Sequence, residues 1–290
     1  MIPIAYITQW RQSAPWASDL HVEQDLILSR VIVDIFSDPL LSKALAFRGG
    51  TALNKLFLKP AARYSEDIDL VRTSTGAIAP IVNALRARLD PWLGEPKRES
   101  KDSSFKLKYT FNPEHSPKIK QKIKIEINTR ECFAVYDRLL EPFSVTSDWF
   151  SGTANVNTYQ FEELIATKLR ALYQRKKGRD LFDLWVAFQH KEMDVTKIIH
   201  AFQYYMKQEG NKITREMFEQ NLEQKIATLS FVDDVSILLS PGMAKTQSVP
   251  IAQENGGLIL TDDGRHFIAS EGWSLYEAAS LVKEKILIHL

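Results

Sequence analysis

The chain has 290 residues, of which 44% are hydrophobic and 25% charged, and its formal net charge is +1. This composition is ordinary for a globular protein, and the length allows one large domain or two small ones. A nearly balanced charge excludes a general attraction to nucleic acid, so such binding would need local basic patches. The single cysteine, Cys132, excludes an internal disulfide framework. No apolar run approaches the roughly 18–20 residues of a membrane span and no signal-peptide pattern opens the chain, so we expect a cytoplasmic protein that binds no membrane.

The first part of the chain mixes helical and extended patterns. Residues 1–18 predict an irregular arm that packs its tryptophans on a core, and Asp19 is the expected cap of the helix that follows. Apolar residues then recur at the spacing of amphipathic helices, separated by short extended segments. The helices expected here cover residues 19–36, 38–45, 51–58 and 78–91.

A glycine pair, Gly49 and Gly50, precedes the helix expected from Thr51. Glycine lets a phosphate approach the backbone closely, and the free N–H groups at the start of a helix favour an anion. A tight turn is the ordinary explanation of such a pair. The glycines therefore indicate a phosphate site only in combination with a second motif.

Two aspartates, Asp67 and Asp69, lie two residues apart in an extended segment with apolar neighbours. Residues i and i+2 of a strand point to the same face, so we expect the two carboxylates side by side. Such a pair suits Mg²⁺, which takes one or two protein carboxylates and completes its shell with water and phosphate oxygens. Paired aspartates are more often solvated or capping residues, but their place after the glycine pair favours a nucleotide site.

Residues 97–124 form a basic block with nine Lys or Arg residues against three acidic ones, a local charge of +6. Aromatic and apolar residues alternate with lysines over 105–111, which predicts a half-buried strand. In the next strand the isoleucines, beginning with Ile119, are expected on one face and Glu126 on the other with the lysines. A lysine face often serves only to discourage pairing at a strand edge. The lysines of this face are Lys118, Lys120, Lys122 and Lys124.

The second half of the chain is mainly helical in pattern. Residues 142–159 predict irregular structure with one short strand, and a helix from Phe161 is expected to carry exposed basic residues, Lys168 among them. In the helix that follows, Asp180 lies near the N-terminus, where an acid complements the helix dipole. Further helices are expected over 195–208, 214–229 and 274–288, with a loop over 240–262. We therefore predict an α+β fold with two lobes, residues 1–140 and 141–290.

Two segments resemble the signatures of a known family. Gly-Gly-Thr-Ala-Leu from Gly49 and Arg-Tyr-Ser-Glu-Asp-Ile-Asp-Leu from Arg63 resemble the first signature of the AbiEii/AbiGii-type (MenT-like) toxins. Lys168 and Arg-Asp-x-x-Asp from Arg179 resemble the second signature. The family is related to the DNA polymerase β-like nucleotidyltransferases. The resemblance covers most of residues 10–190 and implies a nucleotidyltransferase lobe, with a mixed sheet and helices, joined to a mainly helical C-terminal lobe.

The resemblance also implies roles for individual residues. The implied ligands of Mg²⁺ (or Mn²⁺) are Asp67, Asp69 and, as a third carboxylate by position, Glu126. The implied nucleotide-binding residues are Gly49, Gly50, Thr51, Ser65 and Lys168, and the implied catalytic residues are Asp67, Asp69, Lys168 and Asp180. Basic residues expected to hold the acceptor are Lys120, Lys122, Lys124, Arg170, Arg175 and Arg179.

The implied function is that of the toxin in a type IV toxin–antitoxin or abortive infection pair that defends against phage. Such a toxin would transfer NMP from an NTP to an RNA acceptor, the tRNA 3′ end being the expected one, and a cognate antitoxin would be encoded alongside. Two alternatives remain: a transferase that modifies a small molecule or protein, and a non-catalytic protein that binds nucleotide or a partner. The intact Asp-x-Asp, Ser65 and Lys168 argue against the second alternative. The sequence contains no Gly-x-Ser-x-Gly elbow or P-loop, which excludes the corresponding hydrolase and NTPase classes.

Overall fold

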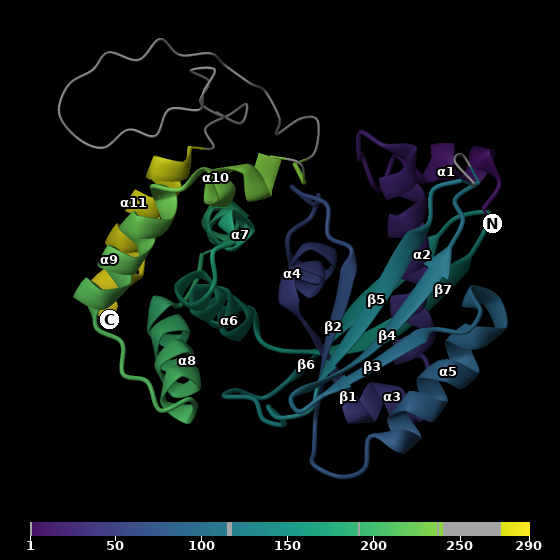
Figure 1. Cartoon of the computed structure of the whole chain (residues 1–290), viewed down its shortest axis with the longest axis horizontal. Coiled ribbons are helices and arrows are strands. Elements are labelled where there is room, and N and C mark those ends of the chain that lie inside the picture. The colour runs from purple at the N-terminus through teal and green to yellow at the C-terminus, as the bar shows by residue number, and fades with distance from the viewer. Residues whose placement is uncertain (1, 115–117, 191, 237, 240–273) are drawn as a thin grey trace. The chain divides into compact units, whose positions relative to one another are not determined.

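The computed structural model describes residues 2–114, 118–190, 192–236, 238–239 and 274–290. The loop expected over 240–262 lies outside these residues. The chain divides into two compact units, Met1–Gln160 and Phe161–Leu290, coloured purple to teal and green to yellow in Figure 1. Helices and a mixed sheet confirm the predicted α+β fold.

The helices of the first unit begin where the sequence supplies a cap. Ser18 accepts a hydrogen bond from the backbone N–H of Leu20 and so caps the second helix, whereas Asp19, the expected cap, is its first residue. Residues 1–18 are not wholly irregular, because they include a short first helix. Ile7 and Trp10 lie one turn apart in this helix, and both are buried. The helices are α1 (Ile4–Trp10), α2 (Asp19–Phe36), α3 (Pro39–Ala44), α4 (Gly49–Ala52), which continues as the wider turn η1 (Leu53–Phe57), and α5 (Ala79–Leu93).

Seven strands form one sheet in the order β3-β4-β5-β2-β1-β7-β6. Strand β2 pairs antiparallel with β1 and parallel with β5, so the sheet is mixed. Helices α2, α3 and α5 contact one another and pack against this sheet (Figure 1). The strands are β1 (Leu45–Arg48), β2 (Asp67–Arg72), β3 (Lys97–Lys101), β4 (Ser104–Phe111), β5 (Gln121–Asn128), β6 (Leu139–Thr146) and β7 (Ser151–Thr158).

Strands β6 and β7 replace the mainly irregular segment expected over 142–159, and that expectation is wrong. The two strands form an eight-residue antiparallel pair, and β7 joins the sheet beside β1 through Phe47 and Thr158. Few of their side chains are buried, so the sequence shows little apolar alternation. Because both strands belong to the sheet, the first unit extends to Gln160, and the expected lobe boundary at residue 140 falls inside β6.

The second unit is helical in its described part. Its core contains large aromatic side chains from three helices, among them Phe182, Phe202 and Phe218, all fully buried. The helix expected over 195–208 is confirmed, and the one expected over 214–229 ends earlier, at Ile226. None of the helices in the described part of the chain has the length and apolar character needed to cross a membrane. The helices are α6 (Phe161–Gln174), α7 (Gly178–His190), α8 (Val195–Gln208), α9 (Arg215–Ile226), α10 (Leu229–Ser236) and α11 (Leu275–Lys285), followed by the single turn η2 (Leu287–His289).

Candidate active site

The Asp-x-Asp segment opens strand β2, as the alternation of its residues predicts. Ile68 and Leu70 are fully buried in the core, while Asp67 and Asp69 lie on the opposite, partly exposed face. Strand β1 pairs with β2 in a register that places Arg48 opposite Asp69. The chain then turns at Gly49, so the glycine pair follows directly from the residue that lies beside the second aspartate.

A side chain at position 49 would be strained for two reasons. The φ of Gly49 is +84°, a left-handed conformation that favours glycine. A Cβ atom at this position would also collide with the carboxylate of Asp69. The backbone therefore approaches the carboxylate more closely than any residue with a side chain would allow, which is the close approach expected at a phosphate site.

Hydrogen bonds join helix α4, which begins at the glycine pair, to strand β2 and the residues just before it. The hydroxyl of Thr51 donates to the backbone carbonyl of Asp67, and its oxygen lies 2.7 Å from the hydroxyl oxygen of Ser65. Since the single hydroxyl proton of Thr51 goes to that carbonyl, Ser65 is the donor in the second bond. Asn54 donates to the carbonyl of Gly50 at 2.9 Å. Thr51 thus holds the glycine turn and the carboxylates at a fixed separation.

An ion pair between η1 and α2 holds the continuation of this helix in place. The amino group of Lys55, in η1, lies 2.7 Å from both carboxylate oxygens of Asp25, in α2. Asp25 also accepts hydrogen bonds from the indole N–H groups of Trp10 and Trp16, at 2.9 and 3.1 Å. The tryptophans of the N-terminal arm therefore anchor on a carboxylate that holds the helix, a role that the sequence analysis did not assign to Asp25 or Lys55.

Strand β5, which carries alternating lysines, lies directly beside strand β2, which carries the two aspartates. The parallel register of β2 and β5 places Lys124 opposite Asp67 and Glu126 opposite Asp69. The amino nitrogen of Lys124 lies 2.8 Å from Oδ2 of Asp67 and 3.5 Å from Oε2 of Glu126. Lys106 binds the other oxygen of Glu126 at 2.9 Å. The carboxylates and lysines of three neighbouring strands thus form one network of charges.

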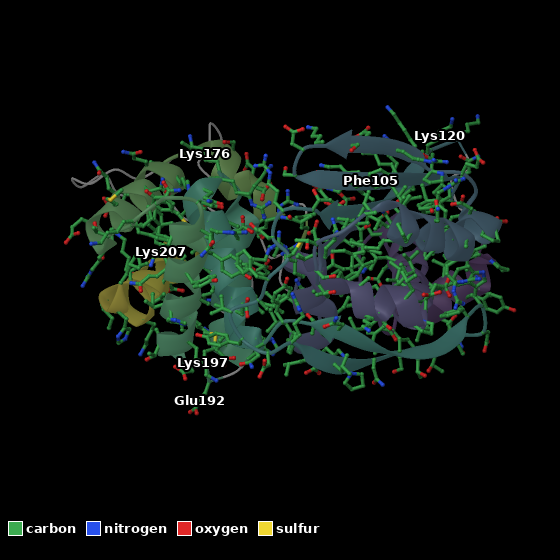
Figure 2. All side chains as sticks on the ribbon, turned by 90° about the horizontal axis from the view of Figure 1, so that it is seen from below. Phe105, Lys120, Lys176, Glu192, Lys197 and Lys207 are labelled. Carbon is green, nitrogen blue, oxygen red and sulfur yellow. The ribbon has the colours of Figure 1, made fainter. Side chains whose placement is uncertain are left out.

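The lysine face is shorter than its alternation suggests. Strand β5 begins at Gln121, so Ile119 lies before it and is 49% exposed, contrary to the expectation that it joins the buried face. Lys122 is exposed, and so is Lys120 (Figure 2). Lys124 differs from them because its amino group is already bound to carboxylates at the candidate site.

The pKa values of this network follow from burial and from neighbouring charges. Burial, helped by the negative charge of Asp67, raises the pKa of Asp69 above its ordinary value. Burial acts in the same direction on Glu126, but the cations of Lys106 and Lys124 outweigh it and lower the pKa of that carboxyl. An added positive charge beside Asp69 would therefore favour the ionised form of this carboxyl.

The oxygen donors present fit Mg²⁺. Two carboxylates on one strand face match the one or two that Mg²⁺ takes from a protein, with water and phosphate oxygens completing the shell. Within the described residues, no group of three His, Cys, Asp or Glu side chains is arranged to hold a metal ion. Asp67 and Asp69 are thus the pair of carboxylates that fits this ion. The carboxylate of Glu126 is bound by Lys106 and Lys124, and Lys124 also binds Asp67.

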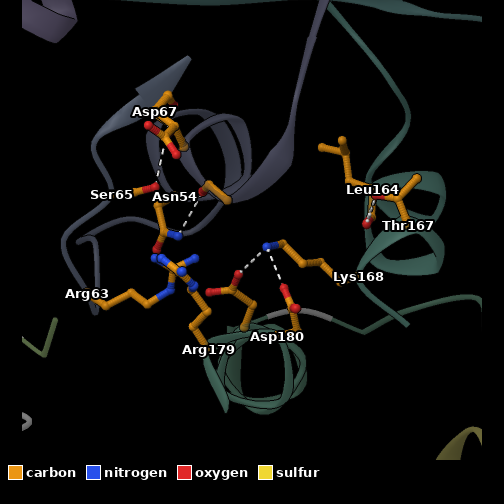
Figure 3. A network of polar contacts seen from close by, with 12 residues as sticks. Asn54, Arg63, Ser65, Asp67, Leu164, Thr167, Lys168, Arg179 and Asp180 are labelled. Atoms are coloured by element: carbon orange, nitrogen blue, oxygen red, sulfur yellow. Dashed lines mark hydrogen bonds and ion pairs between the residues drawn. The ribbon is translucent and has the colours of Figure 1, made fainter. Parts of the chain in front are cut away.

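In the second unit, Lys168 is buried, and its expected exposure on helix α6 is wrong. Its amino group lies 3.2 Å from Asp180 Oδ1 and 2.7 Å from Asp183 Oδ2 (Figure 3). Only 5% of Lys168 is exposed, and both aspartates are fully buried. The spacing could have indicated this, because Lys168 is four residues from both Leu164 and Leu172 and so lies on the apolar side of the helix.

The basic residues near this cluster also have carboxylate partners. Arg175 binds Asp180 through two nitrogens, at 2.6 and 2.8 Å. Burial would raise the pKa of Asp180, but the charge of Lys168 and the bonds from Arg175 outweigh it and lower the pKa. Arg179 lies 3.3 Å from Asp234, and Arg170 stacks on the ring of Tyr205, 4.7 Å from its centre. These arginines therefore stabilise the second unit, whatever else they bind.

Comparisons with known proteins agree with this geometry. Residues 30–242 match the family described as the nucleotidyl transferase AbiEii toxin of type IV toxin–antitoxin systems. The chain is similar to MenT4, the nucleotidyltransferase toxin Rv2826c from Mycobacterium tuberculosis H37Rv, with a TM-score of 0.56, 17% identity, and 83% of this chain and 84% of that chain covered. It is also similar to JHP933 from Helicobacter pylori, with a TM-score of 0.50, 16% identity and 94% of each chain covered. At these identities the two structures support the fold alone. No curated protein matches the sequence.

Proposed function

The chain belongs to the AbiEii family of nucleotidyl transferase toxins, and from this premise we propose that it transfers NMP from an NTP to an RNA acceptor. The 3′ end of tRNA is the acceptor that we propose. The observation that carries the proposal is the pairing of Asp67 and Asp69 beside a glycine whose missing side chain leaves the second carboxylate open to close approach. The family implies a cognate antitoxin, and we propose abortive infection as the biological setting.

The proposed reaction is an in-line displacement. The acceptor hydroxyl attacks the α-phosphorus of the NTP, and the bond to the bridging oxygen breaks, so that pyrophosphate leaves. Mg²⁺ (or Mn²⁺) held by Asp67 and Asp69 would neutralise the phosphates and lower the pKa of the attacking hydroxyl. Both carboxylates must be ionised for this role, and we propose that Gly49, Gly50 and Ser65 border the phosphates, because Ser65 is hydrogen-bonded to Thr51 of the helix that the glycines begin.

We propose that the RNA acceptor binds basic side chains on the sheet of the first unit. Register places Lys108 beside Lys124, and Lys97 beside Lys108, so lysines from β5, β4 and β3 follow one another across one face. This row starts at the strand that carries Glu126 and continues to the exposed Lys97, 77% of whose side chain is exposed. We propose that Lys108 and Lys97 of this row hold the phosphates of the acceptor, together with the exposed Lys120 and Lys122.

The roles implied for Lys168 and Asp180 stay proposals of their own. Their charges are satisfied inside the second unit, where two cations balance two carboxylates. A loss of transfer after substitution therefore has two sources, a missing catalytic group or a destabilised unit. Activity of such variants must be compared at a temperature at which each variant is folded.

Incubation of the purified protein with total RNA and each labelled NTP in turn tests the proposal. We expect label on RNA with one NTP, and no label with Asp67→Asn or Asp69→Asn, because either change removes a proposed metal ligand. Glu66→Gln is the matched control, since it neutralises the exposed carboxylate that lies next to Asp67. Equal transfer by Asp69→Asn would contradict the metal site. Label on a protein or a small molecule, with none on RNA, would contradict the RNA acceptor.

A further inference from the structure

Lys124 occupies a position that the proposed metal ion would also have to approach. Its amino group lies 2.8 Å from Oδ2 of Asp67, which is one of the proposed ligand atoms. The strand register fixes this contact, because Lys124 and Asp67 are direct neighbours in the parallel pair of β5 and β2. The ammonium group is thus the cation that Asp67 holds when no metal is bound.

The charges around Lys124 explain why it lies there. Three carboxylates, those of Asp67, Asp69 and Glu126, crowd one face of two adjacent strands. Lys124 contacts the first and the last of them, and Lys106 takes the remaining oxygen of Glu126. The ammonium group therefore lies among carboxylates from two adjacent strands, which accounts for its position.

A divalent ion on Asp67 would bring a second positive charge next to this ammonium. Like charges at such distances repel, and the repulsion is strong where water is partly excluded. The lysine side chain is a flexible four-carbon stem that carries a point charge, so it can turn without moving the strand. About 29% of the Lys124 side chain is exposed, which leaves it a direction in which to turn. The triphosphate that arrives with the metal supplies oxygens as new partners.

We propose that Lys124 is an exchangeable counterion: it neutralises Asp67 in the metal-free enzyme, gives up that carboxylate to the metal ion, and then binds a phosphate of the nucleotide. This inference rests on the proposed function, since it needs the metal site on Asp67 and Asp69. It also reassigns Lys124 from the acceptor surface, where the sequence placed it, to the nucleotide. Lys124 acts here as a competitor of the metal ion for Asp67 and then as a ligand of the phosphate.

The proposal makes two predictions of opposite sign for Lys124→Met. Without nucleotide, the variant should bind Mn²⁺ about three- to tenfold more tightly, because the competing ion pair is removed. With Mn²⁺ present, it should bind NTP about tenfold more weakly, because a charge-assisted bond to a phosphate is lost. If Lys124 only joined β5 to β2, replacing it would not increase the affinity of the protein for the metal.

Titration of the full-length protein with Mn²⁺, followed by electron paramagnetic resonance of the free ion, measures the first effect. Isothermal calorimetry with a non-hydrolysable NTP measures the second. Lys101→Met is the matched control, because Lys101 is an exposed lysine on β3 of the same sheet with no proposed role in binding, and the change should leave Mn²⁺ affinity unchanged. Lys124→Arg keeps the charge and should restore wild-type Mn²⁺ affinity. Lys124→Gln provides a second neutral variant with a polar side chain in case the methionine variant does not fold.

The outcomes separate the inference from the function on which it rests. If Asp67→Asn binds Mn²⁺ as well as the wild type does, the metal site is wrong and the inference falls with it. If Asp67→Asn loses Mn²⁺ but neither neutral variant of Lys124 binds it more tightly, the inference alone is overturned. Tighter Mn²⁺ binding together with unchanged NTP binding would overturn the phosphate contact.

Discussion

Replacing Lys168 with methionine should destabilise the second unit strongly. The amino group of Lys168 lies 2.7 Å from Asp183, and it shares Asp180 with Arg175. Removing one partner of a buried ion pair costs about 3–5 kcal/mol. Methionine matches the lysine stem in length, so the loss of packing is small and the charge accounts for most of the cost.

The expected fall in melting temperature follows from the size of the unit that unfolds. Unfolding entropy is about 2.1 cal/mol/K per residue, or roughly 270 cal/mol/K for the roughly 130 residues of the second unit. A loss of about 3–5 kcal/mol then lowers Tm by about 11–18 °C if that unit unfolds alone, and by about 5–8 °C if the whole chain unfolds together. The size of the shift therefore also reports whether the two units melt separately.

Thermal denaturation followed by circular dichroism, with urea titration for the free energy of unfolding, provides the measurement. Lys207→Met is the matched control, because Lys207 is exposed on helix α8 (Figure 2) and its loss should cost no more than about 0.5 kcal/mol. Lys168→Arg retains the positive charge and should recover part of the stability. A loss below about 1 kcal/mol for Lys168→Met would refute the buried ion cluster. Transfer by each variant is then assayed at a temperature at which it is folded.

Three further predictions concern the glycine turn, the basic surface and acid stability. Gly49→Ala should cost about 1–2 kcal/mol of folding free energy through its left-handed backbone, and should abolish NTP binding because its Cβ collides with a proposed metal ligand. Changing Lys120 and Lys122 together to Gln should flatten the slope of log K against log salt for RNA by about 1.4, since each single-strand phosphate contact contributes roughly 0.7. The pKa of Asp180 in the folded protein is lower than its ordinary value of 3.8, so the ionised carboxylate stabilises the fold at pH values above 3.8. The second unit should therefore lose stability as the pH falls through the folded pKa.

Each of these predictions has its own control. Gly94 also has a positive φ but open space around it, so Gly94→Ala should destabilise the protein without affecting NTP binding. An unchanged salt slope after the lysine changes would remove these residues from the acceptor surface. Melting temperatures measured from pH 7 to about pH 2 test the third prediction, because the folded pKa of Asp180 lies below 3.8. Asp180→Asn should melt at a temperature that changes less over the acid part of this range.

Short-range alternation explains why the aspartate strand could be predicted. The positions of Asp67 and Asp69 on one face follow from the two-residue period of a strand, and the apolar residues between them confirm which side is buried. The strand β7 shows the opposite case, because its pairing with β1 depends on Phe47, far away in the sequence, and its own residues are mostly polar. The local sequence pattern does not predict a strand whose formation depends on pairing with a segment far away in the sequence.

Charged side chains were harder to place than apolar ones for a related reason. Lys168 has the spacing of a buried residue, yet a lysine is expected in water unless its partners are known, and those partners lie on the next helix. Arg175 was expected to bind an acceptor, but it completes the same cluster. The second signature contains Lys168, Asp180 and Asp183, and the structure shows that Lys168 and Arg175 bind these two carboxylates.

The charge network at β5 changes how a substitution of Glu126 should be interpreted. Glu126→Gln removes one of the two carboxylates that hold Lys124, so the ammonium should bind Asp67 more strongly and compete better with a metal ion. A fall in Mn²⁺ affinity would then look like the loss of a third metal ligand. Combining the change with Lys124→Met separates the two explanations, because coupled residues show non-additive effects. If Glu126 acts only through Lys124, Glu126→Gln should leave Mn²⁺ affinity unchanged in the Lys124→Met protein, whereas a true ligand would lower it in both backgrounds.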